Sequence, residues 1–290
     1  MRIRGLKSVL ALSCGLLSLS VSAGAQEDKA MHLKPFADAD HVIYFPTNDV
    51  TKRVPHNKAV NISYHGGPTI TSARVVFIFW GPTFNNSSSA DYSYARTLQA
   101  FRNQFGSTGE YNVITQYSGI LKSSLGSGTA DMFDTSTPPT NVTDSSVRSE
   151  VNKYLSTHTY NSSTIYEVVI PRTSYSSSGT STSCGGPSLA YCAYHGHFSS
   201  SGHDVKYSIE PYPSCSGCKV SGWSDVQNQE HFTCHETREA VTDPDLNAWY
   251  DSSGNEADDK CAWSPTPFLS GGYGYQYEWS NANNGCVQTR

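Results

Sequence analysis

The sequence predicts a mixed α/β domain whose C-terminal part is rich in loops and stapled by disulfides. Short runs of β-branched and aromatic residues alternate with segments of helical periodicity, which favours a layered α/β fold. A helix rich in histidine and glutamate follows two predicted strands. Apart from Cys14, the cysteines all lie between Cys184 and Cys286, so the expected disulfides are confined to the last part of the chain.

Residues 1–25 are predicted to be an export signal. Basic side chains open the chain, and residues 9–21 are apolar but too few to span a bilayer. Ala23-Gly24-Ala25 has the small-x-small pattern of a cleavage site. Since no other segment is long and apolar enough to cross a membrane, we expect a secreted, extracellular protein without a membrane partner.

The rest of the chain divides into an arm and a domain. Residues 26–57 are polar with scattered prolines and no clear period, so we expect a poorly ordered N-terminal arm. Residues 58–290 are enough for a single globular domain with its own core. The formal net charge is −5 and becomes more negative once the signal is removed, which argues against nucleic acid as a partner. We expect a monomer.

The first half of the domain contains a central strand and a helix. Residues 73–80 form an apolar run between turn signals and predict a buried strand. Residues 93–104 place aromatic and aliphatic side chains at helical spacing. Residues 111–117 predict a weaker strand, and the Ser-, Thr- and Pro-rich residues 123–140 predict a loop.

The middle of the domain continues the alternation of helix and strand. Asp144 or Ser145 can cap a helix that reaches about residue 157 and carries apolar side chains on one face. Residues 165–170 predict a second buried strand, and the serine-rich residues 174–183 predict a loop.

Two strands and a long helix are predicted next. Residues 191–198 and 204–210 have strand character and flank a Ser-Ser-Ser-Gly turn. Asp225 opens a helix that Pro244 is expected to end. In this arrangement an edge strand of the sheet lies beside the helix and can pair with an extended peptide.

The long helix carries the motif His235-Glu236-x-x-Glu239. Residues i and i+4 of a helix share a face, so His235 and Glu239 can point at one metal ion. Glu236, one position further round, can reach a water bound to that ion and act as the general base. This is the geometry of the His-Glu-x-x-His metalloprotease helix with its second histidine replaced by a carboxylate, and it predicts a zincin-like mixed sheet.

A third metal ligand is expected from the acidic residues that follow the helix. Glu256 is the first choice and Asp259 the second, because an acidic ligand follows the helix by a similar interval in gluzincin-type metalloproteases. Asp243, closer to the helix, is an alternative. Zinc is the expected metal, since it can lower the pKa of a bound water to about 7. One imidazole and two carboxylates also suit calcium or manganese.

Three further residues are candidates for substrate binding. His195 and His197 alternate along a predicted strand and therefore share a face, where they could contact substrate, bind metal or simply pack. Tyr250 could line a cleft, with a place in the aromatic core as the alternative. The tyrosines that follow Gly271 could stack on sugars, which makes cell-wall polysaccharide a further candidate partner.

The cysteines of an exported chain meet an oxidising environment, so most are expected to pair. The simplest pairing joins neighbours in sequence: Cys184–Cys192, Cys215–Cys218 and Cys261–Cys286. Cys234 is then left as a buried free thiol inside the motif helix. Cys215-Ser-Gly-Cys218 suits a structural disulfide better than a zinc or redox site, because no second such pair exists.

Several segments around the motif form one pattern. The motif is followed by Thr242-Asp243-Pro244, by Asn247-Ala248-Trp249-Tyr250 and by Glu256-x-x-Asp259-x-Cys261, and it is preceded by Tyr64-His65-Gly66-Gly67-Pro68. Together these segments resemble the Exordium / phosphate-induced protein 1 family. Plant members of that family are apoplastic, growth-associated proteins without a settled enzymatic activity. The resemblance therefore implies secretion and treats the acidic motif as one unit.

Two functions follow as hypotheses. The first is a secreted zinc peptidase with the metal at His235, Glu239 and Glu256 or Asp259, in which Glu236 activates water against a peptide or protein substrate. The alternative is a non-catalytic, Exordium-like signalling or cell-wall-associated protein whose acidic or metal site is structural. A carbohydrate-binding module is a third, and a serine hydrolase is poorly supported because the chain has no Gly-x-Ser-x-Gly elbow.

Overall fold

The computed structural model describes residues 42–51, 60–128 and 130–290. Its centre is a six-stranded sheet in the order β1-β9-β10-β6-β3-β4. These strands are β1 Val42–Pro46, β3 Arg74–Trp80, β4 Met132–Asp134, β6 Thr164–Val169, β9 Tyr191–Ser200 and β10 His203–Glu210. The pairs from β10 to β4 are parallel, whereas β1–β9 and β9–β10 are antiparallel. The prediction of a mixed α/β fold with a mixed sheet is confirmed.

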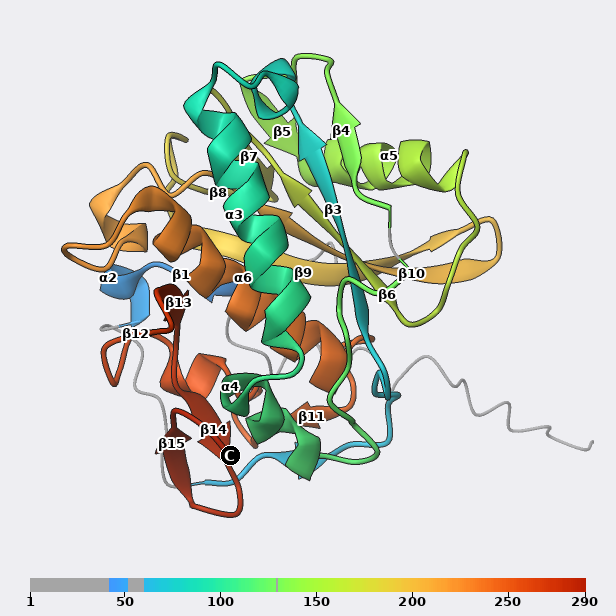
Figure 1. The fold of residues 1–290 in the computed structure, drawn as a ribbon. Coiled ribbons are helices and arrows are strands. Elements are labelled where there is room, and N and C mark those ends of the chain that lie inside the picture. The colour runs from blue at the N-terminus through green and yellow to red at the C-terminus, as the bar shows by residue number, and fades with distance from the viewer. Residues whose placement is uncertain (1–41, 52–59, 129) are drawn as a thin grey trace, which may run out of the picture.

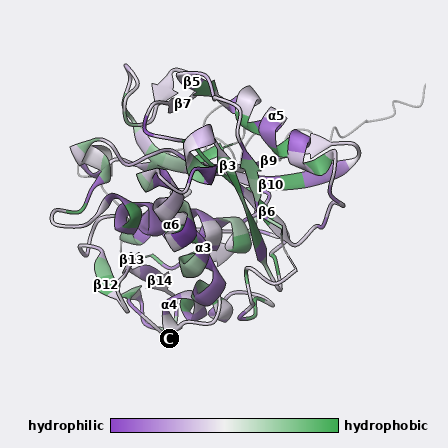
Figure 2. Cartoon of the chain, turned by 45° about the horizontal axis from the view of Figure 1, so that its top comes forward, coloured by the Kyte–Doolittle hydropathy of each residue, from purple (hydrophilic) through white to green (hydrophobic). Residues whose placement is uncertain are grey.

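Helices cover both faces of this sheet (Figure 1). α3 (Ala90–Phe105) and α6 (Asp225–Thr242) lie on one face, and α5 (Asp144–Leu155) lies on the other. The alternation of side chains along β3 explains the division, since Phe77 packs in the core shared with α3 while Ile78 packs in the core shared with α5. Figure 2 shows apolar residues along β3, whereas much of α6 is hydrophilic.

The long helices begin and end close to their predicted bounds because local signals set them. The Ser89 side chain accepts from the Asp91 amide at the start of α3, and Thr143 accepts from the Ser146 amide at the start of α5. The α5 cap is therefore one residue earlier than predicted. A capping box between Ser224 and Gln227 opens α6.

Three segments differ from their predicted structure. The predicted strand over residues 111–117 is wrong: α4 (Gly109–Asn112) and a 3₁₀ turn replace it, because Thr108 caps a helical start. The predicted loop 123–140 contains β4, and the predicted loop 174–183 contains β7 and β8. Their strand structure comes from pairing with distant partners, β3 for β4 and β5 for β7, which local composition does not reveal.

The remaining elements are short. They are α2 Asn48–Thr51, β2 Ser63–Tyr64, β5 Asn141–Thr143, β7 Tyr175–Ser178, β8 Ser181–Thr182, β11 Trp249–Tyr250, β12 Phe268–Ser270, β13 Tyr273–Tyr275, β14 Glu278–Ser280 and β15 Gly285–Val287, with 3₁₀ turns at Pro82–Asn85 (η2), Val113–Gln116 (η3), Ser216–Cys218 (η4) and Asp259–Cys261 (η5). Of these short elements, β13 in the C-terminal part contacts α6. Gly274 allows that approach, since a Cβ there would lie 2.1 Å from the Gln227 carbonyl oxygen.

Part of the predicted N-terminal arm is ordered. Residues 42–46 form β1 and residues 48–51 form α2, so the expectation of poor order is wrong for this stretch. Order comes from pairing with β9, more than 140 residues away in sequence. The predicted export signal and the rest of the arm lie outside the described residues. Among the helices that the structure describes, none has the length and apolar content needed to cross a bilayer.

Three disulfides join the part of the chain that the structure describes. They are Cys184–Cys215, Cys192–Cys218 and Cys261–Cys286, and Cys234 is a buried free thiol as predicted. Only the last of the predicted pairs is correct. The other two bonds each link the region around the start of β9 to the segment between β10 and α6, a proximity that only the folded chain creates. Disulfides of this kind are compatible with export.

Candidate metal centre

α6 is the structural basis of the centre, and it is buried on all sides. Every residue from 228 to 242 is buried, although the stretch is largely polar. The helix lies between β9 and β10 of the sheet, α3, and the C-terminal strand β13. Buried polar groups are costly unless they find partners, so each polar atom of α6 is informative.

The ring of His235 is held in one orientation and one tautomer. Gln276 Nε2 donates to Asp258 twice, to its backbone oxygen at 2.9 Å and to Oδ1 at 2.8 Å. Gln276 Oε1 is thereby left as an acceptor, 3.2 Å from His235 Nδ1. His235 therefore donates through Nδ1 and directs Nε2 at the neighbouring carboxylates, so that Nε2, once it loses its proton, is placed like the nitrogen of a metal-ligating histidine.

Nε2 of His235 faces a carboxylate oxygen of Glu239. Nε2 of His235 lies 3.1 Å from Oε2 of Glu239, one turn further along the helix. Neither atom has a hydrogen-bond partner within the described parts of the chain. The other oxygen of Glu239 accepts from the backbone amide of Asp259 at 3.1 Å, which fixes the carboxylate. Two fixed atoms of this kind facing each other need a proton or a cation between them.

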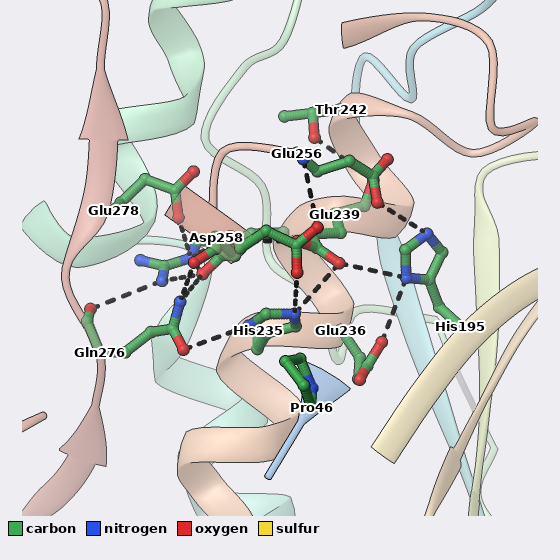
Figure 3. A network of polar contacts seen from close by, with 12 residues as sticks. Pro46, His195, His235, Glu236, Glu239, Thr242, Glu256, Asp258, Gln276 and Glu278 are labelled. Carbon is green, nitrogen blue, oxygen red and sulfur yellow. Dashed lines mark hydrogen bonds and ion pairs between the residues drawn. The ribbon is translucent and has the colours of Figure 1, made fainter. Parts of the chain in front are cut away.

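Two groups of potential ligands meet at Glu239, as Figure 3 shows. One group is His235, Glu239 and Asp259, with Asp259 Oδ1 3.9 Å from His235 Nε2. The other is His195, Glu239 and Glu256, with His195 Nδ1 3.4 Å from Glu239 Oε2 and Nε2 3.6 Å from Glu256 Oε2. All five side chains are buried, and a chain of imidazoles and carboxylates therefore runs through the interior.

Glu236 lies beside this chain and contacts His195. Its Oε2 is 3.1 Å from His195 Nδ1, while its Oε1 has no hydrogen-bond partner within the described residues. Burial and then the charge of Glu239 raise the pKa of the Glu236 carboxyl well above its usual value. Burial alone lowers the pKa of His235, but the neighbouring Glu239 carboxylate outweighs it and raises that pKa to about 9.

The protein's own buried cations are paired with other carboxylates. Arg238 pairs with Asp258 and with Glu278, the latter at 2.9 Å. Lys260 pairs with Asp251 at 2.8 Å. Arg238 and Lys260 are therefore engaged by carboxylates outside the centre, and a divalent cation held there would balance the carboxylates of the centre.

The structure brings the predicted ligands His235, Glu239, Glu256 and Asp259 together, but it places Glu256 and Asp259 in two separate groups that share Glu239. Glu256 and Asp259 both lie near Glu239, and His195, a candidate for substrate contact, metal binding or packing, lies among these potential ligands. Asp243, the alternative ligand, accepts from the Ala248 amide at 2.6 Å and is not in either group.

The other two predicted substrate residues lie elsewhere. His197 pairs with Asp204 at 2.9 Å, in a partly exposed group that also includes Asp245. Tyr250 stacks on His65, with ring centroids 3.7 Å apart, and this supports the core alternative for Tyr250. Position along a predicted strand did not distinguish His197 from His195.

Two further residues support His235, and of these Gln276 was not predicted from the sequence. Gln276 lies after β13 in a tyrosine-rich loop and orients His235. His231, one turn before His235, shares the same Gln276 oxygen at 3.0 Å, and burial lowers its pKa to about 3, so it is a neutral donor rather than a surface residue. The helical spacing of His231 and His235 was a usable signal, but nothing marked Gln276.

Fold and site together define a mixed α/β protein with a buried histidine–carboxylate centre on a polar helix. Comparison of the chain with family models, curated proteins and solved structures found no match. The likeness to the Exordium family therefore stays a prediction from short motifs, and functional argument rests on the centre itself.

Proposed function

We propose that this chain is a secreted, zincin-like zinc peptidase in which Glu236 is the general base. The approach of His235 Nε2 to Glu239 Oε2 carries the proposal, because these buried atoms lie 3.1 Å apart and must share a proton or a cation. Neighbouring ligands of a tetrahedral zinc ion are separated by roughly 3.3 Å, given bonds of about 2.0 Å. The two atoms therefore fit a shared ion with little adjustment.

The donor set favours zinc over calcium. Calcium takes oxygen ligands, whereas imidazole nitrogen suits zinc and other transition metals. The first group offers His235, Glu239 and Asp259, which is an open three-ligand set of the kind found in catalytic zinc sites. When bound, zinc would polarise a carbonyl and lower the pKa of a coordinated water to about 7.

The surrounding side chains supply orientation and proton transfer. Gln276 fixes the ring of His235, and the Asp259 amide fixes Glu239. Glu236 accepts the proton of the attacking water, and His195, 3.1 Å away, holds the Glu236 carboxylate in place. Glu236 would thus be the base, and the buried His195 side chain would hold it in position.

A peptide is the substrate class that the surroundings support. β9, which carries His195, already pairs with the extended segment β1 along one side. A main chain lying along β9 is thus compatible with this geometry, and extended peptides bind sheets by the same strand addition.

Metal content measured by mass spectrometry tests the proposal. After loading with zinc and desalting, we expect about one zinc per wild-type chain, none in His235→Ala, and retention in Glu236→Gln and His195→Ala. Glu236→Gln should also lose hydrolysis of denatured protein. Absence of zinc, or an unchanged His235→Ala variant, would reject the metal centre, and full activity in Glu236→Gln would reject the assigned base.

The non-catalytic, Exordium-like alternative is favoured by one observation. His235, Glu236 and Glu239 have no exposed surface, as expected of a structural metal site. In that case chelation would lower the melting temperature of the protein, and neither wild type nor any variant would hydrolyse peptide.

A further inference from the structure

The outermost strand of the sheet lies over the candidate centre. β1 pairs with β9 in antiparallel register, with Ile43 opposite His195 and Phe45 opposite Ala193. Among the strands that the structure describes, it stands at one end of the sheet order and pairs with β9. The sequence predicts an edge strand beside the helix that can pair with an extended peptide, and in the structure the side of β9 opposite β10 is already taken by five residues of the same chain.

Phe45 fills an aromatic pocket that includes a candidate metal ligand. Its ring stacks on His235 with centroids 4.1 Å apart and on Trp263 at 5.2 Å. The edges of His231 and Phe232 close the other sides, at 5.0 and 5.6 Å. Phe45 is completely buried, so one side chain of β1 both fills the pocket and covers the ring of His235.

The walls of this pocket come from elements other than β1. The core cluster around Phe45 otherwise consists of Cys184, Cys192, Ala193, Cys218, Phe232, Ala262 and Trp263, all from the C-terminal part of the chain. Disulfides hold two walls together, because Cys192 of β9 is bonded to Cys218 and Cys184 to Cys215. A pocket stapled in this way can persist when its occupant leaves.

The main chain of β1 is held as a bound peptide would be. Beyond the strand pairing, Trp263 Nε1 donates to the Pro46 carbonyl at 2.8 Å, and the Thr47 amide donates to the Ala190 carbonyl at 3.2 Å. These contacts use only backbone atoms of the segment. Any extended peptide can therefore make them, and selectivity would come from the side chain in the pocket.

We propose that the edge of β9 is a binding groove for an extended peptide with an aromatic side chain, and that β1 occupies it as an intramolecular inhibitor. This inference rests on the proposed function. It adds the class of substrate and a way in which the activity is regulated. The aromatic side chain takes the place of Phe45, and the backbone of the bound segment replaces β1 along β9. Displacement of β1 uncovers the face of His235 and opens the centre.

Peptide binding to the full-length mature chain tests the groove without any metal or turnover. The probe is a fluorescent peptide with the sequence of residues 42–49, and the measurement is anisotropy in the presence of a chelator. Phe45→Ala empties the pocket in the protein, so we expect this variant to bind the probe at least tenfold more tightly than wild type. Tyr44→Phe is the matched control, since Tyr44 is on the other face of β1, keeps its stacking on Tyr191 as phenylalanine and loses the hydrogen bond from its hydroxyl to the Ser178 carbonyl.

The same peptide with alanine at the position of Phe45 tests selectivity. Loss of a buried phenylalanine side chain should weaken its binding to the Phe45→Ala variant on the order of 100-fold. Equal binding of both peptides, or binding no tighter than to wild type, would overturn the proposal.

Hydrogen exchange of the wild-type chain gives a readout that does not depend on a variant folding. Excess unlabelled peptide should speed exchange of the β1 amides while the amides of β10 keep their protection. If the β1 amides are as protected as those of β10 and do not respond, β1 is a permanent part of the fold. Because these assays contain chelator, failure of the zinc-peptidase proposal leaves their outcome unchanged.

Discussion

α3 and α6 are helices of similar length on the same face of the sheet, but they are buried by different means. α3 has 16 residues and buries one apolar stripe that includes Tyr94, Leu98 and Phe101. α6 has 18 residues and is buried all round between residues 228 and 242, although most of that stretch is polar. An amphipathic stripe is the usual arrangement for a helix on a sheet, so α6 is the exception.

The difference shows how a site can be recognised from burial and hydrogen bonding alone. An apolar stripe is stabilised by burial alone, whereas each buried polar atom needs a partner. Most polar side chains of α6 have one: Gln229 donates to Glu210, Thr237 to Glu167, and Arg238 pairs with Asp258. Two of the atoms that lack one, His235 Nε2 and Glu239 Oε2, face each other, and this pair locates the centre.

The largest expected effect comes from breaking a buried pair of α6. Arg238→Met leaves Asp258 and Glu278 as buried carboxylates without their cation and should lower the free energy of unfolding by about 3–5 kcal/mol. Arg96→Met on the exposed face of α3 should change it by less than about 0.5 kcal/mol. Urea unfolding measures both free energies of unfolding. Similar losses in the two variants would show that the buried arginine of α6 contributes no more to stability than the exposed arginine of α3.

Zinc should stabilise the folded chain through α6. At a concentration one hundred times the dissociation constant, a ligand that binds only the folded state adds about 2.7 kcal/mol. Wild type and Glu236→Gln should show this gain by thermal unfolding, and His235→Ala should not. A gain of equal size in His235→Ala would place the bound ion away from α6.

Burial of Glu230 should make stability depend on pH. Burial raises the pKa of the Glu230 carboxyl to about 8 from 4.5, despite a hydrogen bond from the Gly274 amide. The folded state therefore keeps a proton that the unfolded state loses, so this contribution is complete below pH 4.5 and is lost as pH rises through about 8.

Glu230→Gln removes this titration and keeps an acceptor for Gly274. Relative to the variant, wild type should lose about 1.4 kcal/mol per pH unit between these pKa values. Unfolding free energies of both proteins across pH 5–8 provide the test, and parallel curves would mean that Glu230 is ionised in the folded protein.

The smallest expected effect is a difference in stability between valine substitutions at two threonines of α6. Thr233 is buried and its hydroxyl has no hydrogen-bond partner within the described residues, so Thr233→Val should stabilise the protein by up to about 1 kcal/mol. Thr237 donates to Glu167 at 2.6 Å, and Thr237→Val should cost about 1–3 kcal/mol. Calorimetry of both variants would show the opposite signs, and a shared sign would contradict this assignment of partners.

Much of the fold could be predicted because its signals are local. The helices α3, α5 and α6 and the strands β3, β6, β9 and β10 all lie close to their expected bounds. Hydrophobic period, capping residues and proline set these elements within one stretch of sequence. The strand predicted over residues 111–117 is wrong because aromatic and β-branched residues also fit a short helix once Thr108 caps it.

The centre was predictable only along the helix. The spacing of His235 and Glu239 follows from helical geometry, and the following acidic cluster supplied Glu256 and Asp259. His195 was indistinguishable from His197 by pattern, since both lie on the same face of one strand. Packing against α6 decided between them, because it places only His195 beside Glu236.

The sequence by itself determined the helices and strands with strong periods and the ligands that lie one turn apart. Only the tertiary structure decided the disulfide partners, the orienting role of Gln276 and the place of β1 beside β9. The physical reason is the range of the interactions. Helical spacing and capping act within a few residues, whereas these contacts join segments far apart in the chain and exist only where packing brings them together.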